Sequence, residues 1–145
     1  MILSYNHPLQ RFSVWDLPRE ALERLGPDRE ARVAKAPTDR EKGFIRAGDS
    51  LFFGKGEETD RRVAYADEMG RLASAYPDDH EVQAFYSLAL LATSSDYGYQ
   101  QYRTNITAGG IALQVFNENP DHPGAAHYII HAFDDPIHAA LALPA

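Results

Sequence analysis

Residues 76–89 read YPDDHEVQAFYSLA, and residues 119–132 read NPDHPGAAHYIIHA. The two segments align at an offset of 43 residues, and they share a proline, an aspartate, an aromatic residue and an alanine: Pro77 with Pro120, Asp78 with Asp121, Phe85 with Tyr128, and Ala89 with Ala132. In each copy, proline ends one helix, an aspartate caps the next start, and an apolar helix follows. This repeat predicts an all-α fold, a helical-repeat array of antiparallel helix pairs that bury their faces by stacking on neighbours.

Helix boundary signals continue outward from the repeat, whereas the strand signal is weak throughout. Thr38 and Glu41 form a capping box, in which each side chain satisfies a backbone N–H at a helix start. The helix that they open is predicted to turn five residues inward: Phe44, Ile45, Gly48, Leu51 and Phe52. Further helices are predicted at about 58–75, 81–92 and 99–117. Gly109-Gly110, inside the last of these, indicates a close approach of a neighbouring helix or a kink.

The chain also resembles a known family, and four segments carry the resemblance: YNHP at 5–8, AYADEM at 64–69, AFYSLALL at 84–91, and NPDHPGAAHYIIHAFDDP at 119–136. They look like those of a group of bacterial tetratricopeptide-repeat proteins, and the last motif is long and specific. The resemblance covers nearly the whole chain, although the 43-residue offset exceeds the roughly 34 residues of a plain tetratricopeptide unit. Because the family has no assigned activity, the resemblance implies a fold and no reaction.

The resemblance also bears on completeness, because family members are similar to much longer chains. We therefore expect this chain to be a fragment or a short member of the family. On that expectation, the absence of a signal peptide carries no information about the compartment. Exposed stacking faces at the repeat ends would then favour a homodimer. Within the chain we predict a single helical-repeat domain, 1–145, with N-terminal helices in 1–56 and tetratricopeptide-like helix pairs in 57–145.

Composition excludes several classes of protein. The 145 residues are 44% hydrophobic and include no cysteine, so the chain can bury a core, and disulfides, zinc ribbons and thiol nucleophiles are excluded. No apolar run approaches the roughly 18 residues that span a bilayer, so no membrane span is expected. The compartment stays open between cytoplasm and periplasm.

The charge is unevenly distributed. Residues 1–71 carry 13 basic and 13 acidic side chains, whereas residues 72–145 carry only Arg103 against eight acidic residues, which accounts for the net charge of −7. Such a surface repels a phosphate backbone, so nucleic acid is not an expected partner. A basic peptide, a cation or plain solvation remain open explanations.

A candidate metal site lies in the most specific motif. His127 and His131 are four residues apart and share one helix face, and Asp134 and Asp135 follow one turn later. Two imidazoles and a carboxylate are a facial set that suits a divalent transition metal. The alternative is that both histidines are polar members of a helix-pair interface, since no glutamate completes a metalloprotease motif.

Aromatic residues beside acidic ones form a second candidate site. A ligand-binding groove is predicted from four tyrosines: Tyr97, Tyr99, Tyr102 and Tyr128. Aromatic rings in an acidic setting can receive a basic peptide through cation–π contacts, and packing between repeats is the alternative. Neither a phosphate-binding glycine loop nor a nucleophile elbow is present, and no catalytic residue is assigned. The sequence thus favours a scaffold for a protein or peptide partner over an enzyme, with a metal-binding module or metal-dependent enzyme as the alternative.

Overall fold

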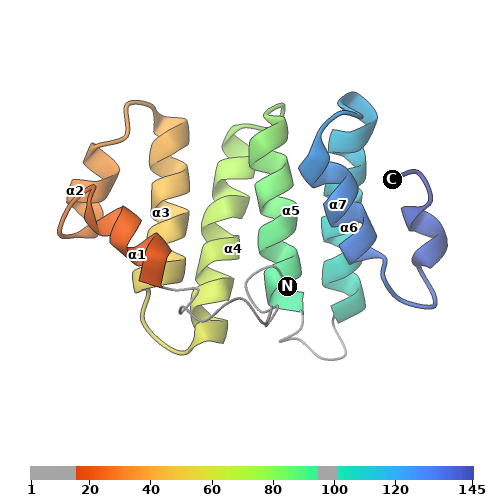
Figure 1. Ribbon diagram of the computed structural model, residues 1–145, viewed down its shortest axis with the longest axis horizontal. Coiled ribbons are helices and arrows are strands. Elements are labelled where there is room, and N and C mark those ends of the chain that lie inside the picture. The colour runs from red at the N-terminus through yellow and green to blue at the C-terminus, as the bar shows by residue number, and fades with distance from the viewer. Residues whose placement is uncertain (1–15, 95–100) are drawn as a thin grey trace. The chain divides into compact units, whose positions relative to one another are not determined.

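The computed structural model describes residues 16–94 and 101–145, and in these residues it contains seven α-helices, a short 3₁₀ helix and no strand (Figure 1). The all-α prediction is confirmed. The chain divides into two compact units, Met1–Leu72 and Ala73–Ala145. This division falls in the last turn of α4 (Glu58–Ala75), whereas the change from N-terminal helices to helix pairs was expected near residue 56.

The N-terminal unit contains α1 (Asp16–Glu23), α2 (Arg29–Ala34), α3 (Asp39–Phe53) and most of α4 (Glu58–Ala75). The predicted capping box is confirmed, because the Thr38 side chain accepts the N–H of Glu41 and the Glu41 carboxylate accepts the N–H of Thr38. The α4 bounds agree with the predicted helix at 58–75. Capping and helix-breaking residues close to the helix ends therefore account for these bounds.

The inward face of α3 differs from the prediction. Leu51 is buried, but the other four residues that were expected inside are only partly buried: Phe44, Ile45, Gly48 and Phe52. The remaining buried positions of α3 are small or polar: Gly43, Ala47, Asp49 and Ser50. A Cβ at Gly43 would lie 2.4 Å from Leu72 Cδ1, so a helix that packs this closely presents small residues rather than aromatic rings.

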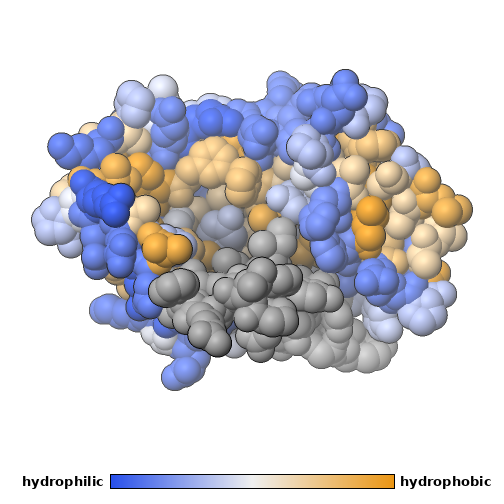
Figure 2. Space-filling model, in the orientation of Figure 1, coloured by the Kyte–Doolittle hydropathy of each residue, from blue (hydrophilic) through white to orange (hydrophobic). Residues whose placement is uncertain are grey.

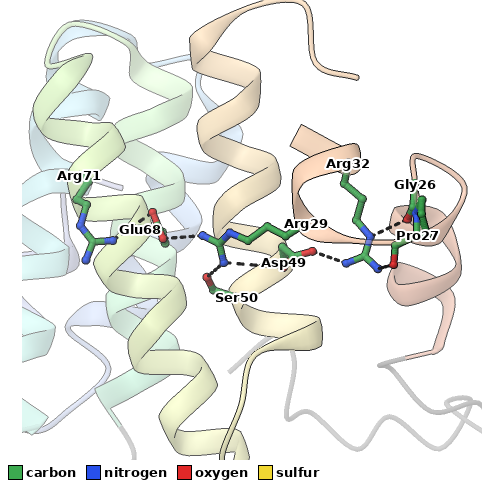
Figure 3. Close-up of polar contacts among 8 residues, drawn as sticks. All are labelled: Gly26, Pro27, Arg29, Arg32, Asp49, Ser50, Glu68 and Arg71. Atoms are coloured by element: carbon green, nitrogen blue, oxygen red, sulfur yellow. Dashed lines mark hydrogen bonds and ion pairs between the residues drawn. The ribbon is translucent and has the colours of Figure 1, made fainter. Parts of the chain in front are cut away.

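A chain of ionic contacts explains why most of α4 belongs to the N-terminal unit (Figure 3). Arg32 and Asp49 form a buried ion pair between α2 and α3. Arg29 donates to Ser50 Oγ at 3.0 Å on α3 and to Glu68 Oε1 at 2.8 Å on α4. The network thus ties three helices together across the predicted boundary at residue 56.

The buried guanidinium of Arg32 is fully engaged. It also donates to the carbonyl oxygens of Gly26 and Pro27, and it stacks over the Phe53 ring at 3.9 Å. Buried charges are tolerated where paired and hydrogen-bonded in this way, so the network has a structural role.

The C-terminal unit contains α5 (His80–Ser94), α6 (Gln101–Glu118), α7 (Pro123–Ala132) and η2 (Ala139–Ala142). In Figure 1, α5, α6 and α7 alternate in direction, as antiparallel helix pairs do. A cluster of buried residues forms the core of this unit: Leu91, Ala108, Ala112, Ile129, Ala132 and Phe133.

Small residues let α6 approach its neighbours. The Ser87 hydroxyl of α5 donates to the Ala108 carbonyl at 2.8 Å. A Cβ at Gly109 would lie only 2.3 Å from Phe133 Cζ, whereas nothing lies within 4 Å of one at Gly110. Of the two interpretations of the glycine pair, close approach therefore applies to Gly109 alone.

The 43-residue repeat is visible in the helix starts, with one correction. The capping side chains are Asp79, which accepts the N–H of Val82 at 3.1 Å, and His122, which accepts the N–H of Ala125 at 3.1 Å. The caps therefore occupy the position after Asp78 and Asp121, at the same offset. The buried faces repeat as well: Val82 with Ala125, and Ala89 with Ala132. The arrangement of these pairs as tetratricopeptide repeats stays a prediction.

Candidate functional site

The structure brings His127 and His131 together on the outer face of α7. Their Nε2 atoms are 3.0 Å apart, and their rings meet edge to face with centroids at 4.5 Å. The helix behind them is fixed, because Ile129 and Ala132 are fully buried. His127 is exposed and His131 is partly buried. Burial, with the neighbouring His127 imidazole second, lowers the pKa of His131, so neutral imidazole is the favoured form.

The two predicted carboxylate ligands do not complete a metal site. No three histidine or acidic side chains in the described part of the chain lie close enough together to hold a metal ion. The physical reason is that α7 ends at Ala132, with Phe133 as its C-cap, so the helical spacing that predicted a shared face stops before Asp134. Asp134 is exposed, and its charge opposes the lowering of the His131 pKa.

Asp135 instead closes the turn after α7. Its Oδ1 accepts the backbone N–H groups of Ile137 at 2.8 Å and His138 at 3.0 Å, and its Oδ2 lies 2.8 Å from His138 Nδ1. Burial pushes the pKa of Asp135 up, but these hydrogen bonds outweigh it and hold the pKa below its usual range. The assignment of Asp135 to the histidine pair is therefore corrected to a turn-forming role.

The structure gives the tyrosines of the predicted groove different neighbours. Tyr97 and Tyr99 lie outside the described residues. Tyr102 is exposed at the start of α6 and packs against the His138 ring, with centroids at 5.6 Å. Tyr128 is half-buried on α7, edge-on to His127 at 5.9 Å. Burial, followed by the nearby charge of Glu81, raises the pKa of Tyr128.

An exposed apolar surface that was not predicted from the sequence includes Tyr102. The contact between Tyr102 and His138 joins the start of α6 to the chain after α7. Four apolar side chains beside this contact are exposed by 45% or more, and we call them the C-terminal apolar surface: Tyr102, Ile106, Ile137 and Leu141. Figure 2 shows apolar side chains on this part of the molecule, at the right of the view. The sequence signal was an apolar run after Pro136 with no helical spacing to assign it a face.

The unit that carries this surface is acidic overall. The C-terminal unit, residues 73–145, carries eight acidic residues against Arg103 and so holds the whole net charge of −7. Asp134, which precedes the surface in the chain, is exposed. An apolar surface on a strongly negative unit is complementary to a segment that is both apolar and basic.

The N-terminal unit contains a separate apolar hollow of about 350 Å³, lined by Leu25, by the connection between α2 and α3, and by α3. Leucine, isoleucine, phenylalanine and proline dominate its lining, and Lys35 and Glu41 are its charged members. Glu41 already closes the capping box. Lys35 is the remaining charged group of the hollow, and one flexible ammonium fixes no ligand orientation.

Comparisons with protein-family models, with curated proteins and with solved structures found no match to this chain. The resemblance to bacterial tetratricopeptide-repeat proteins stays an expectation that is based on the motifs. Within residues 16–94 and 101–145, no helix combines the length and apolar character needed to cross a membrane.

Proposed function

We propose that this protein is a helical-repeat scaffold whose C-terminal unit binds a basic, amphipathic segment of a partner protein. The observation that carries the proposal is the C-terminal apolar surface on a unit with a net charge of −7. Exposed apolar groups that are close together and surrounded by polar residues are typical of interaction sites. Repeat folds commonly present such surfaces to peptides.

Two physical contributions to binding are expected. Aliphatic side chains of the partner remove Ile137 and Leu141 from water, at roughly 25 cal/mol for each Å² buried. Lysine and arginine side chains beside them are attracted by the acidic unit and can stack on the exposed Tyr102 ring. The electrostatic part weakens as salt screens exposed charges, whereas the apolar part does not.

Selection from a random-peptide phage library tests this function. We expect selected peptides to combine aliphatic residues with lysine or arginine, and to bind the full chain more weakly as salt is raised. The double variant Ile137→Ser/Leu141→Ser removes apolar contacts without adding charge, so it should lose binding. Leu17→Ser, at an exposed leucine of the N-terminal unit, is the control.

Two results would contradict the proposal. One is a set of selected peptides that bind the Ile137→Ser/Leu141→Ser variant as tightly as the unchanged protein. The other is a selection that returns acidic peptides, because these would need a surface that the C-terminal unit does not offer.

A second copy of the chain could cover the C-terminal apolar surface in a homodimer and so compete with the basic partner. Light scattering over a range of protein concentrations distinguishes the two. A dimer that the Ile137→Ser/Leu141→Ser variant abolishes would assign the surface to a second copy of the chain and not to a basic partner. A monomer at all concentrations leaves the surface free for a partner.

A further inference from the structure

We propose that His127 and His131 form a two-imidazole chelate for a divalent transition metal, with Cu²⁺ preferred over Ni²⁺ and Zn²⁺. The inference concerns the outer face of α7 and is independent of the peptide-binding proposal. It also departs from the set predicted from sequence, because Asp134 and Asp135 are not ligands in it. The separation of the two imidazole nitrogens is the observation on which it rests.

The distance between the nitrogens fits one coordination geometry well. Imidazole nitrogens bind divalent metals at about 2.0–2.1 Å, so two nitrogens at a right angle are about 2.9–3.0 Å apart, and two at the tetrahedral angle about 3.3–3.4 Å. The Nε2 atoms of His127 and His131 are 3.0 Å apart. The pair therefore has the spacing of two neighbouring ligands in a square or octahedral complex. Cu²⁺ and Ni²⁺ favour these geometries, whereas Zn²⁺ favours a tetrahedral one.

The position of the pair on α7 supplies preorganisation. Residues four apart share one helix face, and the buried Ile129 and Ala132 hold the backbone of that helix in the core. A chelate forms with little loss of conformational freedom when both ligands already converge. Because His127 is exposed, solvent can reach the metal and fill the remaining coordination positions with water.

The protonation state of the pair is compatible with binding. Both Nε2 lone pairs must face the metal, so each neutral ring must carry its proton on Nδ1. His131 Nδ1 is buried and makes no hydrogen bond within the described residues, so the N–H that this tautomer places there lacks an acceptor, and the metal–nitrogen bonds must outweigh that cost. Metal binding then replaces the hydrogen bond between the two Nε2 atoms. The acidic unit around the pair attracts cations.

The other histidines of the same unit are committed elsewhere and so provide controls. His80 Nε2 lies 2.9 Å from Glu118, His122 caps α7 through Nδ1, and His138 is held by Asp135. His80→Ala removes one histidine from the unit without touching the α7 pair. His127→Ala/Ile130→His keeps the histidine count, at an exposed position, but makes the two imidazoles adjacent in the chain, and adjacent residues of a helix do not face each other.

Isothermal titration of the tag-free, chelator-treated full chain with Cu²⁺, Ni²⁺ and Zn²⁺ salts tests the proposal. We expect one Cu²⁺ per chain, an electron paramagnetic resonance spectrum with coupling to two nitrogens, and an affinity order of Cu²⁺, Ni²⁺, Zn²⁺. The second imidazole acts at high effective concentration, so its loss should weaken binding by on the order of a hundredfold. We expect this loss in His127→Ala and in His127→Ala/Ile130→His, but not in His80→Ala.

A merely structural role for the pair predicts something different. The histidine–histidine hydrogen bond would then stabilise α7 without metal, and added Cu²⁺ would leave the melting temperature unchanged. A chelate raises the melting temperature with metal concentration, because a ligand that binds the folded state stabilises it. The proposal is overturned if His127→Ala/Ile130→His binds Cu²⁺ as tightly as the unchanged protein, with circular dichroism showing that both are folded.

Discussion

Replacing Gly109 by alanine tests the packing between α6 and the end of α7. An added Cβ would lie 2.3 Å from Phe133 Cζ and 2.7 and 2.9 Å from the two adjacent ring carbons. Phe133 is only 2% exposed and belongs to the core of the C-terminal unit, so its ring has little room to move. The next residue, Gly110, is exposed and has nothing within 4 Å of such a Cβ. The two neighbouring glycines therefore form a matched pair of positions.

The two substitutions share one effect and differ in another. Alanine is favoured over glycine inside a helix by roughly 0.5–1 kcal/mol, and this gain applies at both positions. Forcing a methyl group into a packed core typically costs about 1–3 kcal/mol, and this cost applies at Gly109 alone. We expect Gly110→Ala to be up to about 1 kcal/mol more stable than the unchanged protein, and Gly109→Ala to be about 0.5–2 kcal/mol less stable.

Urea unfolding followed by far-ultraviolet circular dichroism measures this difference. The denaturation midpoints of the two variants should move in opposite directions, with the dependence on urea unchanged. The reasoning is refuted if Gly109→Ala is as stable as Gly110→Ala, because the Phe133 ring would then not be packed against α6. A steeper or shallower dependence on urea would instead mean that the substitution altered the unfolded or native ensemble.

Three further predictions concern polar contacts. Asp49→Ala leaves the buried Arg32 guanidinium without its carboxylate. We expect urea titration to show a loss of about 3 kcal/mol in unfolding free energy. A loss under about 1 kcal/mol would contradict a buried ion pair. Thr38→Ala removes the α3 cap and should cost about 1 kcal/mol in the same titration, whereas no loss would mean that the capping box is not formed in solution. The pKa of Asp135 is held below its usual 3.8, so its contribution to stability is present above pH 3.8 and is lost as the pH falls through the lowered value. The melting temperature of Asp135→Asn should therefore be lower than that of the unchanged protein near neutral pH, and the two melting temperatures should converge in acid. A difference that persists in acid would mean that the charge of Asp135 is not the source of its contribution to stability.

Sequence periodicity predicted the helices well, because their signals are local. The capping box at Thr38, the helix over 58–75 and the repeated turns before α5 and α7 all depend on residues within a few positions of one another. The inward face of α3 was not predictable in this way. Its buried positions are set by partners far along the chain, Arg32 for Asp49 and Leu72 for Gly43, and no local pattern reveals them.

The expected shared face of Asp134 and Asp135 with His131 is not met for a different reason, because the contacts that decide it are local. Helical spacing placed Asp134 and Asp135 on the face of His131, but the helix stops at Ala132. The turn that follows has its own hydrogen bonds, centred on Asp135, and these decide where the aspartates lie. Spacing arguments hold within one helix, so the His127/His131 pair was brought together as predicted and the carboxylates were not.

The histidines of the C-terminal unit show why residue counts alone do not identify a site. The histidines of this unit make four kinds of contact. His80 contacts a carboxylate on another helix, and His122 contacts a backbone N–H. The α7 pair contact each other, and His138 contacts the aspartate of a turn. Only in the α7 pair do two such rings converge within coordination distance of one another. Of the three histidines in the motif, His122 alone is explained by a cap, and the other two form the α7 pair. The metal-binding potential of the motif comes from His127 and His131, which are four residues apart on α7, a helix whose opposite face is buried in the core.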